Sequence, residues 1–270
     1  MAVFTKDAIE VFITFCRSKG LASETLRWYS GIFRRFEREY PQLPETPEPI
    51  QQFLANIKVG DERLHGYYRA IRALYNYIDR RLRAFPNPMM FVDPPRRKRK
   101  EPRPLTPEDL DQLLAYPHTA WIKAALMFLA DTGVRMNEAR TLMPGDMIEM
   151  PWGYFALVRG KTGERFVPVS YDAYKAIQGI APIRFSKSWF SRLISRAFKD
   201  ARVRGSGINL RHTFGSMWYG DVTVLQKIMG HSKISTTLMY RQICNEYVAN
   251  QHRQFTPLRS VYSMTRRLML

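Results

Sequence analysis

The second half of the 270-residue chain holds short stretches whose side chains could act on a phosphate ester. In chain order they are TGVRMNEARTL, GKTG, INLRHTF and MGHSKISTTLMY, which contain Arg135, Lys161, Arg211, His231 and Tyr240. Arginines offer paired N–H donors to phosphate oxygens, and two of them can neutralise the charge that grows as phosphorus becomes five-coordinate. A tyrosine hydroxyl has an unperturbed pKa of roughly 10, and nearby arginines favour its nucleophilic phenolate.

Taken singly, each stretch has an ordinary structural explanation. Arg135 and Glu138 are three residues apart, so they could simply form a surface ion pair worth under about 1 kcal/mol. A lysine at a hairpin tip, such as Lys161, is usually only solvated, and a lone tyrosine such as Tyr240 is usually packed. The order and spacing of the whole set are what indicate chemistry.

That order and spacing resemble the tyrosine recombinase, or phage integrase, family. The family reads TG-x-R-x-x-E, a lysine in a β-hairpin, H-x-x-R-H-T, GH and, about nine residues later, T-x-x-Y. The resemblance covers roughly 104–245, and the matched catalytic positions are Arg135, Lys161, Arg211, His231 and Tyr240.

The resemblance implies a mechanism. Tyr240 would attack phosphorus, form a 3′-phosphotyrosyl link and expel a 5′-hydroxyl. Lys161 would be the general acid for that leaving group, and His231 would donate a hydrogen bond to a non-bridging oxygen. Because phosphotyrosine keeps the energy of the broken phosphodiester, rejoining needs no ATP and no metal. The sequence holds neither a phosphate-binding glycine loop nor a metal-ligand set, so we expect no cofactor and no metal site.

Two further residues are expected to support this set. Glu138 is expected to orient Arg135 or its helix. His212 lies about 100° round the helix from Arg211, which favours a buried hydrogen-bonding role over a catalytic one.

The helix that carries Arg211 has a recognisable start and a buried face. Asn209 is a candidate N-cap, because its side-chain oxygen can accept a first-turn amide. Leu210, Phe214 and Met217 recur at helical spacing and predict the buried face.

The charge of the chain points to a polyanion. It carries 42 Lys and Arg against 24 Asp and Glu, a net charge of +18. Such an excess favours double-stranded DNA as partner. A membrane partner is disfavoured, because the sequence contains no 18-residue apolar run and no signal pattern. The two cysteines, Cys16 and Cys244, give neither a metal spacing nor a disulfide framework, so a reducing cytoplasmic setting at the host nucleoid is expected.

The excess charge lies in the linker and the second half. Residues 1–93 carry 14 basic and 11 acidic side chains, whereas 94–103 carry six against one. Prolines flank this run and hold it extended, so we expect it to follow a phosphate backbone; a solvated run or a localisation tract is the alternative. The expected DNA contacts are Arg96, Arg97, Lys98, Arg99 and Lys100, together with Arg192, Arg196 and Lys199 on a later helix, for which a solvated surface is the alternative.

The local patterns predict a mainly α fold with a small β-hairpin. Residues 1–93 are expected to form an all-α core DNA-binding domain with helices at about 6–19, 23–39, 47–58 and 61–82. Residues 94–104 form the basic linker. Residues 105–270 form a mostly α catalytic domain, with a helix start at Thr106, a helix end at Gly133 and a hairpin over 153–169.

The resemblance also implies an assembly. In the family a C-terminal segment packs into a neighbouring subunit and links four protomers on DNA. We therefore expect a homo-tetramer on DNA. In the absence of DNA, a monomer is the alternative. For the last helix, between about 245 and 268, packing on its own domain is an equal alternative.

The function that follows is site-specific recombination for the integration or excision of a phage or mobile element. One rival is a sequence-specific DNA-binding protein that kept the fold and lost catalysis. Another is an enzyme of the type IB topoisomerase kind, which shares the same chemistry.

One position departs from the family pattern and generates a prediction. Ile208 stands where the family has a histidine, three residues before Arg211, and it can neither accept nor donate a proton. We expect Ile208→His to raise the single-turnover cleavage rate, because it restores a proton acceptor. An unchanged or lower rate would count against a missing acceptor at this position.

Overall fold

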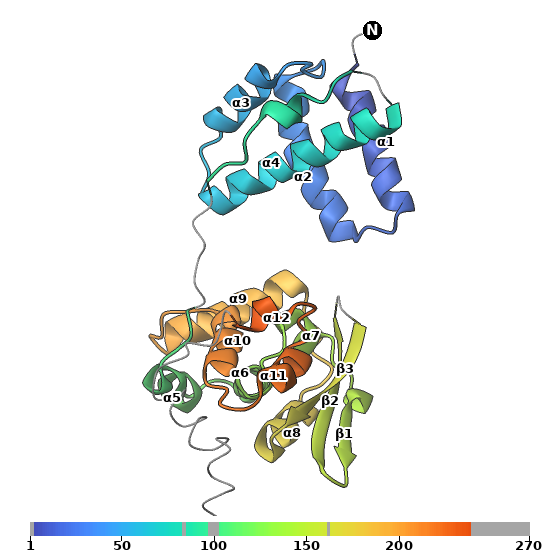
Figure 1. The fold of residues 1–270 in the computed structure, drawn as a ribbon. Coiled ribbons are helices and arrows are strands. Elements are labelled where there is room, and N and C mark those ends of the chain that lie inside the picture. The colour runs from blue at the N-terminus through green and yellow to red at the C-terminus, as the bar shows by residue number, and fades with distance from the viewer. Residues whose placement is uncertain (1–2, 83–84, 97–102, 161–162, 239–270) are drawn as a thin grey trace, which may run out of the picture. The chain divides into compact units, whose positions relative to one another are not determined.

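The computed structural model describes residues 3–82, 85–96, 103–160 and 163–238 (Figure 1). Contacts divide the chain into two compact units, Met1–Lys100 and Glu101–Leu270. The described residues are mainly helical and contain one three-stranded sheet, which confirms the fold class predicted from the sequence. None of the described helices has the length and apolar character needed to cross a bilayer.

The N-terminal unit is a helical bundle with an aromatic core. Its α-helices lie where the sequence predicts them: α1 Thr5–Ser18, α2 Ser23–Glu39, α3 Pro47–Asn56 and α4 Asp61–Tyr77. Phe36 and Phe53 are fully buried and meet edge to face, with ring centroids 4.9 Å apart. The buried Tyr75 hydroxyl donates to the Pro44 carbonyl at 2.8 Å, so this ring fills the core without leaving a polar group unsatisfied.

The C-terminal unit is built around helix α6. Its elements are α5 Pro107–Ala115, α6 Ala120–Thr132, α7 Met136–Arg140, β1 Met147–Met150, β2 Gly153–Gly160, β3 Gly163–Val169, α8 Tyr171–Gln178, α9 Lys187–Asp200, α10 Gly207–Ser216, α11 Val222–Met229 and α12 Ile234–Leu238. Ala125, Leu126, Phe128 and Leu129 of α6 are fully buried. Helices α8 and α10 pack most extensively against α6, and α5, α7 and α9 also contact it (Figure 1).

The sheet is antiparallel, with strand order β1-β2-β3. The β2–β3 hairpin confirms the prediction for 153–169, with Gly160 opposite Gly163 at its end. The turn between them contains Lys161, which lies outside the described residues. Strand β1 and helix α8 were not predicted; Ser170 caps α8 by accepting from the Ala173 amide.

Two of the predicted helix signals are confirmed and one is wrong. Thr106 accepts from the Asp109 amide at 3.1 Å, as an N-cap should. Helix α6 ends at Gly133, which has a left-handed φ of 60°. Asn209, however, is not the N-cap of α10, because the helix begins earlier and Ser206 occupies that position. The Asn209 side chain instead accepts from the Ser206 amide at 2.9 Å, as the third residue of a capping box does.

The predicted buried face of α10 is present in part. Leu210 is fully buried, whereas Phe214 and Met217 are half-buried. The helix predicted between about 245 and 268 lies outside the described residues.

Candidate active site

Arg211 is a buried cation of the predicted set. It lies in α10, and the residue is only 3 % exposed. Its Nη1 donates to the Gly133 carbonyl at 2.6 Å and its Nη2 to the Met229 carbonyl at 2.8 Å. A buried guanidinium is tolerated only when its donors are satisfied, so these carbonyls hold the cation in place.

Both carbonyls belong to the C-terminal ends of helices. Gly133 ends α6 and Gly230 ends α11, with φ values of 60° and 63°. The C-terminal end of a helix carries partial negative charge, which favours a cation there. A side chain at Gly133 would also collide with the Phe214 ring, so this position requires glycine for space as well as for conformation.

His231 follows Gly230 directly and contacts Arg211. The Arg211 Nη2 lies 2.7 Å from the His231 Nε2, and the His231 Nδ1 lies 2.9 Å from the Thr237 Oγ1. Because arginine only donates, Nε2 must accept, which assigns the proton of the neutral ring to Nδ1. Burial, assisted by the charges of Arg211 and then Arg135, lowers the pKa of His231 to about 4.

Arg135 lies at the start of α7 and is held by Glu138. The Arg135 amide donates to Oε2 of Glu138 at 2.9 Å, and its Nη1 donates to Oε1 at 3.0 Å. Glu138 is buried, so the pair is not the surface ion pair that its spacing alone would suggest. The Arg135 side chain, in contrast, is 41 % exposed and can still reach an anion.

A residue that sequence reasoning missed completes this ion pair. Arg165 on β3 donates from Nη2 to Oε2 of Glu138 at 2.9 Å and from Nη1 to Oε1 at 3.2 Å. Its Nε donates to the Ile228 carbonyl at 2.7 Å. Burial raises the pKa of Glu138, but hydrogen bonds and charge from Arg165 and Arg135 outweigh burial and lower it overall. The alternation of β3 was the available signal, because Arg165 shares a face with the buried Val167 and Val169.

A cavity of about 430 Å³ adjoins this cluster. Arg165 and His231 line it, together with residues from the start of β3 and the end of α11. Arg135 and Arg211 are not among its lining residues, so the cavity adjoins the cluster through Arg165 and His231.

The remaining predicted site residues fall into two groups. Lys161 and Tyr240 lie outside the described residues, as do Arg97, Lys98, Arg99 and Lys100. His212 is half-buried, and burial followed by the charge of Arg211 lowers its pKa. Ile208 is 48 % exposed on the first turn of α10, so this position is open to substitution.

The predicted DNA contacts that the structure describes are exposed. These are Arg96, Arg192, Arg196 and Lys199. The Arg192 guanidinium lies over the Trp189 ring, 4.9 Å from its centroid, and Arg196 lies 3.7 Å from the Asp200 carboxylate. Within the described part of the chain, no three His, Cys, Asp or Glu side chains gather as metal ligands would.

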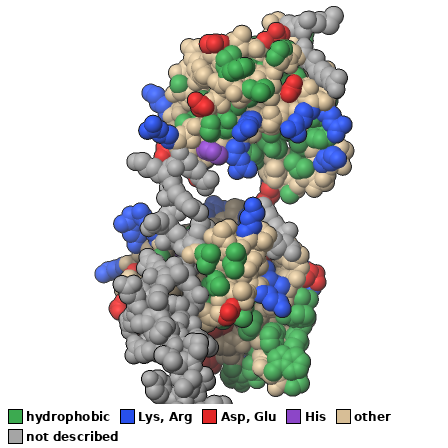
Figure 2. Space-filling model, viewed as in Figure 1, with side chains coloured by type: hydrophobic (Ala, Val, Ile, Leu, Met, Phe, Trp, Pro, Cys, Tyr) green, Lys and Arg blue, Asp and Glu red, His purple; other side chains and the backbone are tan. Residues whose placement is uncertain are grey.

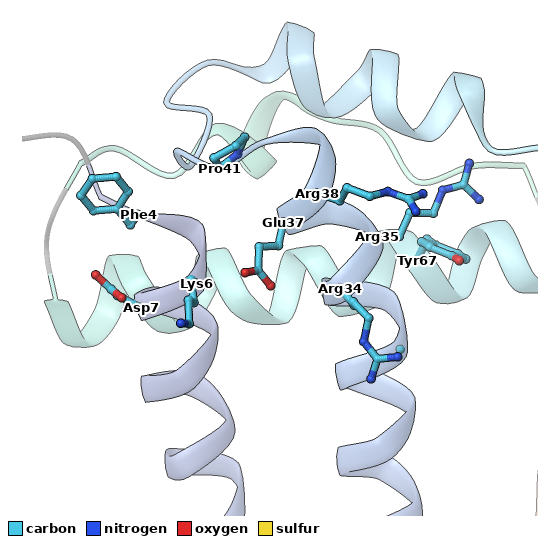
Figure 3. A pocket seen from close by; sticks show the side chains of 10 residues that line it. Phe4, Lys6, Asp7, Arg34, Arg35, Glu37, Arg38, Pro41 and Tyr67 are labelled. Carbon is cyan, nitrogen blue, oxygen red and sulfur yellow. The ribbon is translucent and has the colours of Figure 1, made fainter.

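A second basic surface lies in the N-terminal unit, where Figure 2 shows Lys and Arg side chains gathered along one edge. A groove of about 890 Å³ runs between α1 and α2 and reaches Tyr67 of α4; it is lined by Lys6, Arg34, Arg35 and Arg38 and by the acidic Asp7 and Glu37 (Figure 3). A neighbouring groove of about 460 Å³ shares Gly31 and Tyr67 with it. We call the first of these the basic groove.

The lowered pKa of His231 gives a prediction for the pH dependence of stability. A folded-state pKa of about 4 lies below the usual 6.5, so the unfolded chain binds the proton more tightly. The stabilisation from neutral His231 is therefore complete above pH 6.5 and is lost as the pH falls toward 4. We expect the free energy of unfolding, measured by urea titration, to fall less steeply over this range in His231→Gln than in the wild type. His212 titrates in both proteins, so equal slopes would contradict the assignment to His231.

The chain is similar in sequence to known proteins. Residues 103–246 match the model of the Phage integrase family. The chain is 22 % identical over 270 residues to the tyrosine recombinase XerA of Pyrococcus horikoshii, covering 91 % of this chain and 92 % of the relative. It is 25 % identical over 258 residues to the tyrosine recombinase XerD of Yersinia pestis, covering 80 % and 83 %.

Solved structures show the same fold. The lambda integrase(75-356) dimer bound to a COC′ core site superposes with a TM-score of 0.75 at 17 % identity, covering 91 % of this chain and 97 % of that one. The XerH site-specific recombinase bound to a palindromic difH substrate gives a TM-score of 0.67 at 17 % identity, covering 84 % and 78 %. The family match spans more than half of the chain and includes each motif of the predicted set. The chain therefore belongs to the phage integrase family and is a tyrosine site-specific recombinase.

Proposed function

We propose that this recombinase cuts and rejoins double-stranded DNA through a 3′-phosphotyrosyl intermediate formed by Tyr240. The observation that carries the proposal is the convergence of Arg135, Arg211 and His231. These residues come from three separate motifs: His231 contacts Arg211 and lines the cavity, and the charge of Arg135 acts on the His231 ring. Such a cluster is suited to bind and polarise a single phosphate.

The two arginines have different parts in this proposal. Arg211 is fixed by helix-end carbonyls and offers a preorganised positive charge that needs no rearrangement during the reaction. The Arg135 side chain is 41 % exposed and uses one of its nitrogens on Glu138, which leaves its other donors for phosphate oxygens. Together they would neutralise the charge of the five-coordinate phosphorus.

His231 must change its hydrogen bonding when phosphate arrives. Without DNA its Nε2 accepts from Arg211 and has no proton to donate. A phosphate that takes over the Arg211 donor would release Nε2, and its negative charge would raise the pKa of the ring. His231 could then donate to a non-bridging oxygen, which is the part that the family resemblance implies.

The covalent step balances without a cofactor. The Tyr240 hydroxyl oxygen bonds to phosphorus as the bond from phosphorus to the 5′ oxygen breaks. Lys161 gives the leaving oxygen its proton, and the tyrosine proton passes to a base or to water. Rejoining reverses these transfers, with a 5′-hydroxyl attacking the phosphotyrosine.

We further propose a biological role in DNA integration or excision. The family description favours integration or excision of a phage or mobile element, and a DNA-acting enzyme of this kind would work in the host cytoplasm. The basic linker fits binding to a duplex, and a tetramer is the proposed assembly that exchanges strands. Two fold neighbours, lambda integrase and XerH, are described as bound to a core site and to a difH substrate.

The first test is covalent capture. A nicked duplex library with a randomised centre is incubated with the full chain, and protein–DNA adducts are isolated under denaturing conditions. We expect the wild type to form an adduct and Tyr240→Phe to form none, because phenylalanine lacks the nucleophilic oxygen.

Each alternative gives a different result in that test. An adduct that persists in Tyr240→Phe would mean that another residue is the nucleophile. Binding without any adduct would favour a non-catalytic DNA-binding protein. Plasmid relaxation without strand exchange would favour the topoisomerase-like alternative.

The second test concerns the basic groove as a phosphate-binding surface. Each phosphate that the protein neutralises contributes about −0.9 to the slope of log K against log salt. Removing one such contact therefore makes the slope less steep by about that amount. We expect each of Arg34→Gln, Arg35→Gln and Arg38→Gln to weaken binding to the captured duplex and to reduce the slope of log K against log salt by about that amount. Lys58→Gln is the matched control, because Lys58 is an exposed cation of the same unit outside the groove. Equal slopes in all four variants and the wild type would show that the basic groove does not bind DNA phosphates.

A further inference from the structure

Glu138 is shared between two arginines, and this sharing decides the charge at the site. Its Oε1 accepts from Nη1 of Arg135 at 3.0 Å and from Nη1 of Arg165 at 3.2 Å. Its Oε2 accepts from the Arg135 amide at 2.9 Å and from Nη2 of Arg165 at 2.9 Å. The three side chains together carry a net charge of +1, whereas Arg135 and Glu138 alone would be neutral.

Arg165 takes the bidentate position on the carboxylate. Its side chain is 12 % exposed and both of its terminal nitrogens bond to Glu138, while Arg135 bonds through one terminal nitrogen only. A carboxylate has room for a limited number of donors, and the two terminal nitrogens of Arg165 already occupy a position on each of its oxygens. Arg135 is therefore prevented from turning its whole fork toward Glu138.

The surrounding backbone is shaped for this ion pair. A side chain at Gly160 would collide with the Glu138 carboxylate, and one at Gly230 would come within 2.9 Å of the Arg165 guanidinium. The Nε of Arg165 is also anchored to the Ile228 carbonyl at 2.7 Å. Arg165 thus joins β3, α7 and the end of α11, the helix that precedes His231.

We propose that Arg165 is a positioning residue that keeps Arg135 available for phosphate. By neutralising Glu138 it leaves Arg135 its full positive charge and directs the free donors of Arg135 away from the carboxylate. Arg165 is not proposed to touch DNA, so it acts through Arg135. This inference rests on the proposed phosphotyrosyl chemistry.

The test is a second-site rescue measured as single-turnover adduct formation on the captured nicked duplex. We expect Arg165→Gln to lower the rate about 10-fold to 100-fold, because Arg135 then pairs with an unshared carboxylate. Adding Glu138→Gln removes that carboxylate, so the double variant should form the adduct at least about 5-fold faster than Arg165→Gln. A role in folding alone predicts that the adduct rates of these variants follow their free energies of unfolding, which a urea titration measures in parallel.

Two further variants make the test specific. Arg159→Gln is the matched control, because Arg159 lies on the same hairpin and forms its ion pairs with Asp146 and Glu164 instead of Glu138. Its rate should stay within about 3-fold of the wild type. Arg165→Lys keeps the charge and should lose less than Arg165→Gln; it also serves if the glutamine variant does not fold.

The outcomes separate this inference from the proposed function. Absence of a wild-type adduct would overturn the proposed function itself. A normal wild-type adduct with no loss in Arg165→Gln, or with a double variant no faster than the single one, would overturn only the role of Arg165. An equal loss in Arg159→Gln, or a folded Arg165→Lys as slow as Arg165→Gln, would do the same.

Discussion

The site depends on the burial of one positive charge, the guanidinium of Arg211. A buried cation is costly unless polar groups replace the water it loses, and here two helix ends supply carbonyls to it. Both helices end at a glycine with left-handed φ, and this conformation stops each helix so that its last carbonyls lie at Arg211. The stretches TG-x-R and GH are therefore helix ends as well as sequence motifs. Gly133 supplies one carbonyl for Arg211, and Met229, just before GH, supplies the other; each is followed two residues later by another site residue, Arg135 or His231.

A second electrostatic arrangement lies beside the first. Glu138 is buried, yet its pKa is lowered because Arg165 and Arg135 both donate to it. The carboxylate fixes the position of Arg135 without leaving the side chain buried, since Arg135 remains 41 % exposed. One arginine is thus held in the interior and the other is presented at the surface. In the proposed function, a phosphate would meet the buried charge of Arg211 and the exposed donors of Arg135.

Much of this could be predicted from the sequence, because the relevant signals are local. Gly133 and Thr106 mark a helix end and a helix start through backbone conformation and capping, which depend on near neighbours alone. The hairpin over 153–169 follows from alternation and a glycine turn. The order of the motifs indicated the family, and the match over 103–246 confirms it.

The features that were missed depend on tertiary contacts. Asn209 has the side chain of an N-cap, but Ser206 takes that position and Asn209 donates to the Arg103 carbonyl at 2.7 Å instead. Strand β1 has four residues, too few for a clear alternation, and it is defined by pairing with β2. Arg165 resembles any strand arginine until the fold brings Glu138, 27 residues away in sequence, against it.

The most direct measurement is the crystal structure of the full chain trapped as a covalent complex with nicked duplex DNA. The account predicts a bond from the Tyr240 oxygen to phosphorus, with non-bridging oxygens bound by Arg135 and Arg211. The carbonyls of Gly133 and Met229 should still hold Arg211, and the His231 Nε2 should have left Arg211 for the phosphate. A phosphate bound elsewhere, or an Arg211 that has lost both carbonyls to reach it, would contradict the account.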